Sequence, residues 1–387
     1  MKVKSRLYNT IVEILSQHKR WLDVRHMYTL VWMVVGIIRS GKISLTAWIP
    51  YVESRAKYAQ SIQRRFQRWL YNNRINVNSL YGPLIERALS EWGNHTLYLV
   101  LDTSRLLEDY CLIRISALFR GRAIPVVWKV LEHKSNNVSY QVYKELLDYA
   151  AKLLPMGVKV VLLADRGFAD TGLMGHVKTL GWHFRIRIKS SFLVYSKGQW
   201  RSVDEFPLQP GDAVFLNHVY LTGQEYGPVC LALGYHTEED ERWYVASDEP
   251  VGLETFQEYG SRFDIEESFL DDKSNGFQLE SSEIRSAEGL ERLCMVLAVA
   301  TLYLVSQGVE VVRKGKRRLV DPHWFRGSSY LKIGWRWVKM ALSKGWRLCR
   351  KLRLIGGSDP EPAMASLESA SKRLPPVFKV VCQDHSP

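Results

Sequence analysis

The chain has 387 residues, which is too long for one simple core, so we expect two or three domains. Its composition, 46% apolar and 24% charged, is ordinary for a soluble folded protein. The five cysteines are scattered and form no CxxC pair, which argues against a disulfide framework and a zinc site and fits a reducing cytosol.

The formal net charge of +13 is unevenly distributed along the chain. Residues 1–95 hold 15 Lys or Arg against 5 Asp or Glu, and residues 309–354 hold 14 against 2. Between these flanks, residues 96–308 hold 21 against 29. Basic flanks favour a polyanion, because each neutralised phosphate releases condensed counterions. An acidic centre favours metal ions, since its carboxylates would otherwise repel phosphates. Charge alone leaves a generic basic soluble protein open.

Residues 1–95 are predicted to form a helical DNA-binding domain, because apolar residues recur there at helical spacing. Within it, residues 54–71 carry Arg64, Arg65 and Arg68, with apolar side chains spaced to pack on the other face. Such a helix can lie in a DNA groove, as recognition helices do. It can equally be a packing helix with a solvated basic face, and the sequence favours neither interpretation.

From residue 96 the pattern changes to runs of β-formers alternating with helical segments. Residues 96–189 predict the order βββαβαβ, a mixed sheet with helices packed on it. Residues 190–250 are turn-rich with short alternating strands, which predicts a β-rich insertion. Helices resume in residues 251–308, which complete an α/β core. Residues 309–354 are predicted to be a basic helical C-terminal region, and residues 355–387 a flexible tail.

The best candidate for a membrane span is residues 295–312. It contains Gln307 and Glu310 and is short of a full membrane span, so we expect a buried helix. We expect no signal peptide and no membrane partner.

Two predicted strands end in an aspartate. Asp102 follows an apolar run in LVLDTS, and Asp165 follows another in LLADRGF. Burying an unpaired carboxylate is costly, and metal coordination is one reason to place it there. The carboxyl ends of strands in α/β sheets are also where sites gather. A third acidic cluster lies on the predicted helix YGSRFDIEESFLDDK.

These motifs resemble the DDE transposases of the insertion-sequence-4 family. The signature of that family on the third-carboxylate helix is matched at every spacing by Tyr259, Arg262, Glu266 and Lys273. The first and second aspartates of the family correspond to Asp102 and Asp165, as the motifs LVLDTS and ADRGF indicate. The resemblance covers about residues 96–306 and implies a ribonuclease-H-like mixed sheet core split by the β-rich insertion.

The signature spacing also has a physical meaning. Arg262 and Glu266 are four residues apart, and Lys273 is seven beyond Glu266, so all three share one helix face. Glu266 can then ligate metal while Arg262 and Lys273 meet phosphate oxygens. Glu267 points roughly 100 degrees away on a helix, so the spacing selects Glu266. A salt-bridged surface helix is the alternative interpretation.

The mechanistic hypothesis is that Asp102, Asp165 and Glu266 bind two Mg²⁺ ions, for which Mn²⁺ can substitute, and support in-line displacement on DNA. The resemblance implies cleavage at the inverted-repeat ends of a mobile element, followed by transfer of the strand to target DNA. It also implies double-stranded DNA as partner, a homodimer on DNA, and a prokaryotic cytoplasmic location at the nucleoid.

Trp243, in RWYVASDEPV, carries a further hypothesis. Family members that cut through a DNA hairpin resemble this stretch, and there the Trp stacks on a flipped base. The alternative is a core Trp that closes the insertion against the catalytic sheet.

Two other functions remain open at this point. A metal-dependent nuclease on the same core would cleave without rejoining strands. A DNA-binding protein descended from a transposase would have no activity, although all three carboxylates and the signature are present.

Overall fold

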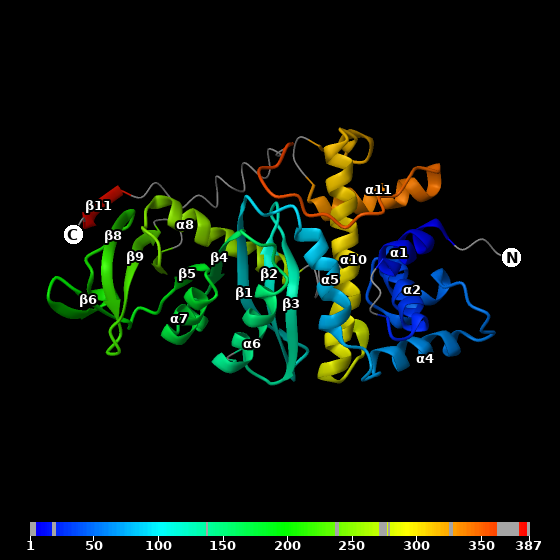
Figure 1. The fold of residues 1–387 in the computed structure, drawn as a ribbon, viewed down its shortest axis with the longest axis horizontal. Helices are drawn as coiled ribbons and strands as arrows, with labels where there is room; N and C mark the ends of the chain where they lie inside the picture. The colour runs from blue at the N-terminus through cyan, green and yellow to red at the C-terminus, as the bar shows by residue number, and fades with distance from the viewer. Residues whose placement is uncertain are drawn as a thin grey trace.

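A computed structural model describes residues 5–17, 21–136, 138–236, 240–270, 277, 279–324, 328–361 and 379–384. The molecule is elongated, with a sheet along one part of its length and a group of helices at the other end (Figure 1). The long helix α10 (Ala287–Arg313) stands between the two.

The N-terminal region is helical, as predicted. It comprises α1 (Arg6–Ser16), α2 (Val24–Ser40), α3 (Leu45–Trp48), the 3-10 turn η1 (Ile49–Tyr51), α4 (Ala59–Leu70) and α5 (Val77–Leu89). Polar side chains begin most of these helices by accepting a free backbone N–H; Asn76, for example, accepts from Ser79 at 2.8 Å. Helix α2 ends at Gly41, whose φ of 77° closes the helix at no steric cost.

The core sheet is built from β1 (Thr96–Leu106), β2 (Tyr110–Leu118), β3 (Ala123–Glu132), β4 (Lys159–Ala164) and β5 (His183–Arg187), in the order β3-β2-β1-β4-β5. Strands β1 to β3 are antiparallel neighbours, whereas β4 is parallel to β1 and to β5. Helices α6 (Tyr140–Ala151) and α7 (Thr171–Thr179) make the two crossovers. This is the predicted βββαβαβ order and the topology of a ribonuclease-H-like core.

The β-rich segment does not form a separate sheet. Its strands are β6 (Leu193–Ser196), β7 (Gln199–Ser202), β8 (Asp212–Leu221), β9 (Tyr226–His236) and β10 (Glu241–Ser247). Because β10 pairs antiparallel with β5, the core sheet continues as β5-β10-β9-β8-β6-β7. Strand β11 (Lys379–Asp384), within the segment predicted as a tail, runs parallel to β8.

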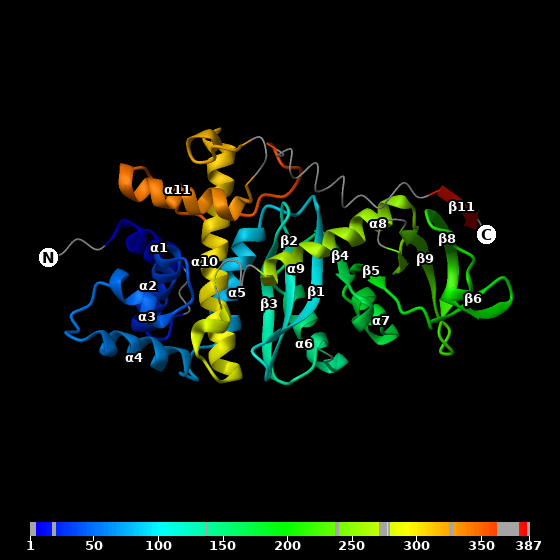
Figure 2. The same ribbon diagram turned by 180° about the vertical axis from the view of Figure 1, so that it is seen from behind.

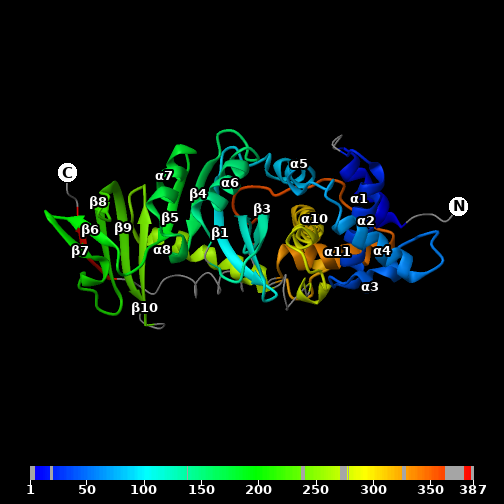
Figure 3. The same cartoon turned by 90° about the horizontal axis from the view of Figure 1, so that it is seen from below.

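Helices cover both faces of the core sheet. Helices α6 and α7 lie on one face, while α8 (Leu253–Gly260) and α9 (Asp264–Leu270) lie on the other (Figure 3). Between α8 and α9 the chain makes the 3-10 turn η4 (Ser261–Phe263), so the signature segment is three consecutive helical pieces. Figure 2 shows α8 and α9 crossing in front of the sheet.

Helix α10 packs between β3 and the N-terminal helices and is crossed by α11 (Tyr330–Lys344). The crossing is so close that a Cβ on Gly334 would overlap the carbonyl oxygen of Leu304. By length and composition α10 could span a membrane, and so could α2 taken together with α3 and η1. However, 94% of the apolar window of α10 is buried within the protein, as in the core helix of a soluble protein.

Candidate active site

Asp102 and Asp165 lie side by side, although Asp102 does not end its strand as predicted, because pairing with β2 continues β1 to Leu106. The parallel register pairs Leu101 of β1 with Ala164 of β4, so Asp102 and Asp165 are the next residues on neighbouring strands. Neighbouring strands are about 4.8 Å apart, and residues in register point to the same face. Both side chains are fixed locally, since the Oδ1 atom of Asp102 accepts the Thr103 N–H at 2.7 Å and that of Asp165 accepts the Gly167 N–H at 2.8 Å.

Arg262 connects this pair to the third carboxylate. Its guanidinium donates to Oδ2 of Asp102 at 3.1 Å and to Oε1 of Glu266 at 2.8 Å. The Arg262 side chain is 6% exposed and that of Asp102 13%, whereas that of Glu266 is 51% exposed. One buried cation thus holds together a carboxylate of the sheet and a carboxylate at the solvent boundary.

The charges of the three carboxylates affect one another. Burial, together with the neighbouring charges of Asp165 and Glu266, raises the pKa of Asp102 to about 6, against the opposing effects of Arg262 and the Thr103 N–H. Burial disfavours the charged form of Arg262, but Tyr259, Asp102 and Glu266 outweigh it and raise the pKa of the guanidinium. The arrangement therefore concentrates negative charge that a cation has to offset.

The donor types suit a hard divalent cation, because three carboxylates from β1, β4 and α9 offer only oxygen ligands. Among the described residues, no three His, Cys, Asp or Glu side chains come close enough to hold an ion in this arrangement. Arg262 is the cation that Asp102 and Glu266 share here. The three carboxylates fit a divalent metal ion in their chemistry, and Arg262 contacts two of them.

Tyr259 and Trp243 are buried together beneath this helical segment. Tyr259 is fully buried, and its ring lies edge-on to the indole of Trp243 with centroids 5.5 Å apart. Trp243 is 6% exposed, packs also on Phe256 and Phe263, and donates from Nε1 to Glu241 at 2.9 Å. Trp243 is therefore a core residue in this structure, as the alternative to base stacking predicted. Stacking on a DNA base would require its ring to leave this aromatic cluster.

The other predicted DNA contacts are not brought to the triad. Arg64 and Arg68 are exposed on α4, at the far end of the molecule from β4 (Figure 1). Arg65 is half-buried beside Tyr8, and burial lowers the pKa of its guanidinium. The basic face of α4 therefore presents two solvated cations and one that is packed. Lys273 lies outside the described residues.

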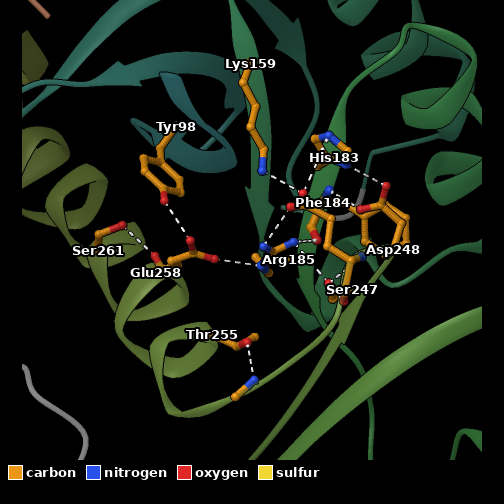
Figure 4. A network of polar contacts seen from close by, with 12 residues as sticks. Tyr98, Lys159, His183, Phe184, Arg185, Ser247, Asp248, Thr255, Glu258 and Ser261 are labelled. Carbon is orange, nitrogen blue, oxygen red and sulfur yellow. Dashed lines mark hydrogen bonds and ion pairs between the residues drawn. The ribbon is translucent and has the colours of Figure 1, made fainter. Parts of the chain in front are cut away.

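A buried ionic network, which the sequence reasoning missed, anchors α8 to the sheet (Figure 4). Glu258 of α8 accepts from Tyr98 of β1 at 2.7 Å and from Arg185 of β5 at 2.7 Å. Arg185, 6% exposed, also donates to Glu249 at 2.9 Å and to Ser247 at 3.0 Å. Tyr98 and Asp102 lie on the same face of β1, because they are four residues apart along a strand. Glu258 contacts the first and Arg262 the second, so the network sets the position of Arg262.

Further contacts extend this network to the strand β4. Glu249 accepts from Lys159 at 2.6 Å, and Asp248 contacts the His183 ring at 2.9 Å. The signals in the sequence were an arginine at the centre of a short strand, Arg185 in HFRIR, and the acidic pair Asp248-Glu249 after β10. A buried cation in a strand requires acidic partners.

The fold and the three carboxylates define a class: enzymes with a ribonuclease-H-like core and an acidic site on its central strands. Comparison with known families identifies the group more closely. The profile of the transposase DDE domain matches residues 108–303, about half of the chain. The chain belongs to this family of transposases, whose members cleave DNA in reactions that depend on divalent metal ions. The matched stretch includes Asp165 and Glu266 and begins just after Asp102.

Among solved structures, the chain is similar to a piggyBac transposase synaptic complex with hairpin DNA, determined by cryo-electron microscopy. The identity is 10% and the TM-score 0.44, over 98% of this chain and 84% of the other. No curated protein matches the sequence.

Proposed function

We propose that this protein is a transposase of the insertion-sequence-4 type that cuts and rejoins DNA at the inverted-repeat ends of a mobile element. The observation that carries the proposal is the contact of Arg262 with both Asp102 and Glu266, beside Asp165. The spacing of Tyr259, Arg262 and Glu266 supports the family assignment.

In this proposal Asp102, Asp165 and Glu266 hold divalent metal, with Mg²⁺ as the physiological ion and Mn²⁺ as a substitute. When bound, the ions supply activation of the attacking oxygen and stabilisation of the leaving oxygen of a phosphodiester. Before metal binds, the hydrogen bonds of Arg262 hold the side chains of Asp102 and Glu266 close to one another. Its guanidinium donors are then available to non-bridging phosphate oxygens, for which a planar fork is suited.

The test is a strand-transfer reaction. A duplex that ends in the terminal repeat of the element, with a free 3′-hydroxyl, is incubated with the full-length protein, Mg²⁺ and a target plasmid. We expect joined products that disappear with EDTA and with Glu266→Gln. Glu145→Gln is the matched control, since Glu145 is 60% exposed on α6, on the opposite face of the sheet.

The products separate the alternatives. In a parallel reaction, a longer duplex carries the terminal repeat uncut. Cleavage of this uncut end without joining of the pre-cut end would identify a nuclease, and absence of both reactions would identify a DNA-binding relative without activity. A denaturing gel of the reaction on the uncut end also tests the hairpin route, because a hairpin end migrates at twice the single-strand length. Its absence would limit the proposal to direct cleavage and transfer.

A further inference from the structure

An extended segment near the C-terminus crosses α10. Residues 346–354, called the strap below, are held by two buried polar side chains of that helix. The side-chain amide of Gln307 donates to the carbonyl of Cys349 at 2.8 Å and accepts its N–H at 2.9 Å. Ser306 accepts the N–H of Arg353 at 3.0 Å. Both polar groups are satisfied by the strap, which is therefore fixed in place.

The inner side of the strap is apolar. Leu352 and Leu354 are buried, and the N–H of Leu354 donates to the carbonyl of Ala88 in α5 at 2.8 Å. The outer side carries Arg347, Arg350 and Lys351, all exposed. The segment thus presents a row of cations on a backbone anchored to α10 and α5.

The strap, α1 and the end of α10 enclose a groove of about 840 Å³. Seven Lys or Arg side chains line it, against two glutamates. A second cavity of about 500 Å³ adjoins it, sharing Lys314, Trp346 and Arg347, and continues to Lys316 and Trp337. Together they form one path, called the basic groove below. Lys316 lies over the Trp337 ring at 5.6 Å.

Part of this charge is offset within the protein. Glu310 pairs with Arg313 at 3.0 Å and with Lys314 at 2.7 Å, and Glu13 pairs with Arg350 at 3.3 Å. By contrast, the side chains of Arg347 and Lys351 make no ion pair with any residue that the structure describes. The groove therefore retains a surplus of positive charge that faces solvent.

The basic groove is separate from the carboxylates. It lies where α1, α11 and the C-terminal end of α10 meet, whereas the triad lies on β1, β4 and α9 (Figures 1 and 2). Strands β2 and β3 and helix α10 stand between them in the order of packing. A ligand in the groove would not compete with the reacting phosphate.

We propose that the basic groove binds the phosphodiester backbone of double-stranded DNA outside the cleavage site, without reading its sequence. The inference rests on the proposed function, because it assigns a second contact to the same substrate. Phosphates suit the groove since each unpaired cation can release condensed counterions from the duplex, and no base-reading geometry is needed. Arg347 and Lys351 are the residues assigned to this contact.

The experiment measures binding of a fluorescent 30-base-pair duplex of random sequence to the full-length protein in EDTA, by anisotropy, between 50 and 200 mM salt. Omitting metal makes the result independent of cleavage. We expect the double substitution Arg347→Gln with Lys351→Gln to flatten the slope of log affinity against log salt by about 2, since each lost phosphate contact removes about 0.9. Affinity at low salt should fall by at least tenfold.

The matched control is Lys152→Gln with Lys178→Gln, two exposed cations on the α6–α7 side, which should leave slope and affinity unchanged. Acetylation of lysines, followed by mass spectrometry, gives a second readout. DNA should protect Lys351 but not Lys152. An unchanged salt slope in the double variant, or equal acetylation of Lys351 with and without DNA, would overturn the proposal. Absence of strand transfer by the wild-type protein, with its duplex binding intact, would instead count against the proposed function.

Discussion

The triad and the basic groove manage charge in opposite ways. At the triad, two carboxylates come from the sheet and the third from α9, and one buried arginine, Arg262, is shared between Asp102 and Glu266. In the basic groove, eight Lys or Arg side chains gather around two glutamates, and Arg347 and Lys351 are exposed to solvent. The first arrangement holds negative charge that a cation can offset, and the second holds positive charge that an anion can offset.

The difference in burial has an energetic consequence. A charge removed from water depends on its partner, whereas an exposed charge costs little to replace. Substitutions around the triad should therefore affect folding and function together. Substitutions of the strap cations should affect DNA binding alone. Each prediction below tests one side of this contrast.

The largest effect on stability is expected for Trp243→Ala. The indole fills a cluster with Phe256, Tyr259 and Phe263, so its removal should lower the free energy of unfolding by about 4 kcal/mol. Urea denaturation without DNA measures this. Unchanged stability combined with an altered spectrum of cleavage products would instead favour the base-stacking role.

The next largest effect is expected for Arg262→Gln. It should lower the free energy of unfolding by about 3 kcal/mol, because Asp102 would remain buried without its cation. Arg262→Lys should recover part of this loss but not strand transfer, since an ammonium cannot donate a fork to two carboxylates. Thermal unfolding and the strand-transfer assay test the two statements. Full activity of the lysine variant would show that the shared contact is not needed.

Arg185→Met should lower the free energy of unfolding by about 2 kcal/mol. This is less than the loss expected for breaking a fully buried ion pair, because Glu249 and Glu258 are 21% and 24% exposed. Despite burial, which acts to raise it, the pKa of Glu249 is lowered by its contacts with Lys159 and Arg185. Its contribution is therefore present above the ordinary value of 4.5 and is lost as pH falls below it. When the free energy of unfolding is measured by urea denaturation between pH 6 and 3, the variant should lose less stability than the wild type. Parallel plots of stability against pH for the two proteins would contradict this.

The smallest effect is expected for Arg347→Gln with Lys351→Gln, which should change the free energy of unfolding by less than about 0.5 kcal/mol. Both side chains are exposed, and the strap is fixed by backbone contacts with Ser306 and Gln307. Urea denaturation would place the wild type and the variant on the same curve. A larger loss would mean that these cations support the strap itself.

Much of the core could be predicted from the sequence, because its signals are local. The apolar runs before Asp102 and Asp165 predict two buried strands, and parallel pairing of β1 and β4 brings the two aspartates together, although β1 continues beyond Asp102. The four-residue spacing of Arg262 and Glu266 places them in contact, as the structure shows at 2.8 Å. The reach of Arg262 to Asp102 could not be predicted, since it depends on how α8 and η4 lie over β1.

The remaining features depend on pairing between distant segments. The insertion joins the core sheet only because β10 pairs with β5, and no local pattern states which strand is its neighbour. In the sequence, the polar residue Gln307 argued against a membrane span, and its helix α10 is buried as predicted. Its hydrogen bonds to Cys349, 42 residues away, follow only from the folded chain.

The most direct test of the central claim is nicking of a supercoiled plasmid that carries both element ends, with Mg²⁺, by the wild type and by Asp102→Asn. The predicted result is a loss of at least about 10³-fold in cleavage rate, with the salt dependence of duplex binding unchanged. Retention of Mg²⁺-dependent cleavage by Asp102→Asn would contradict the assignment of the triad.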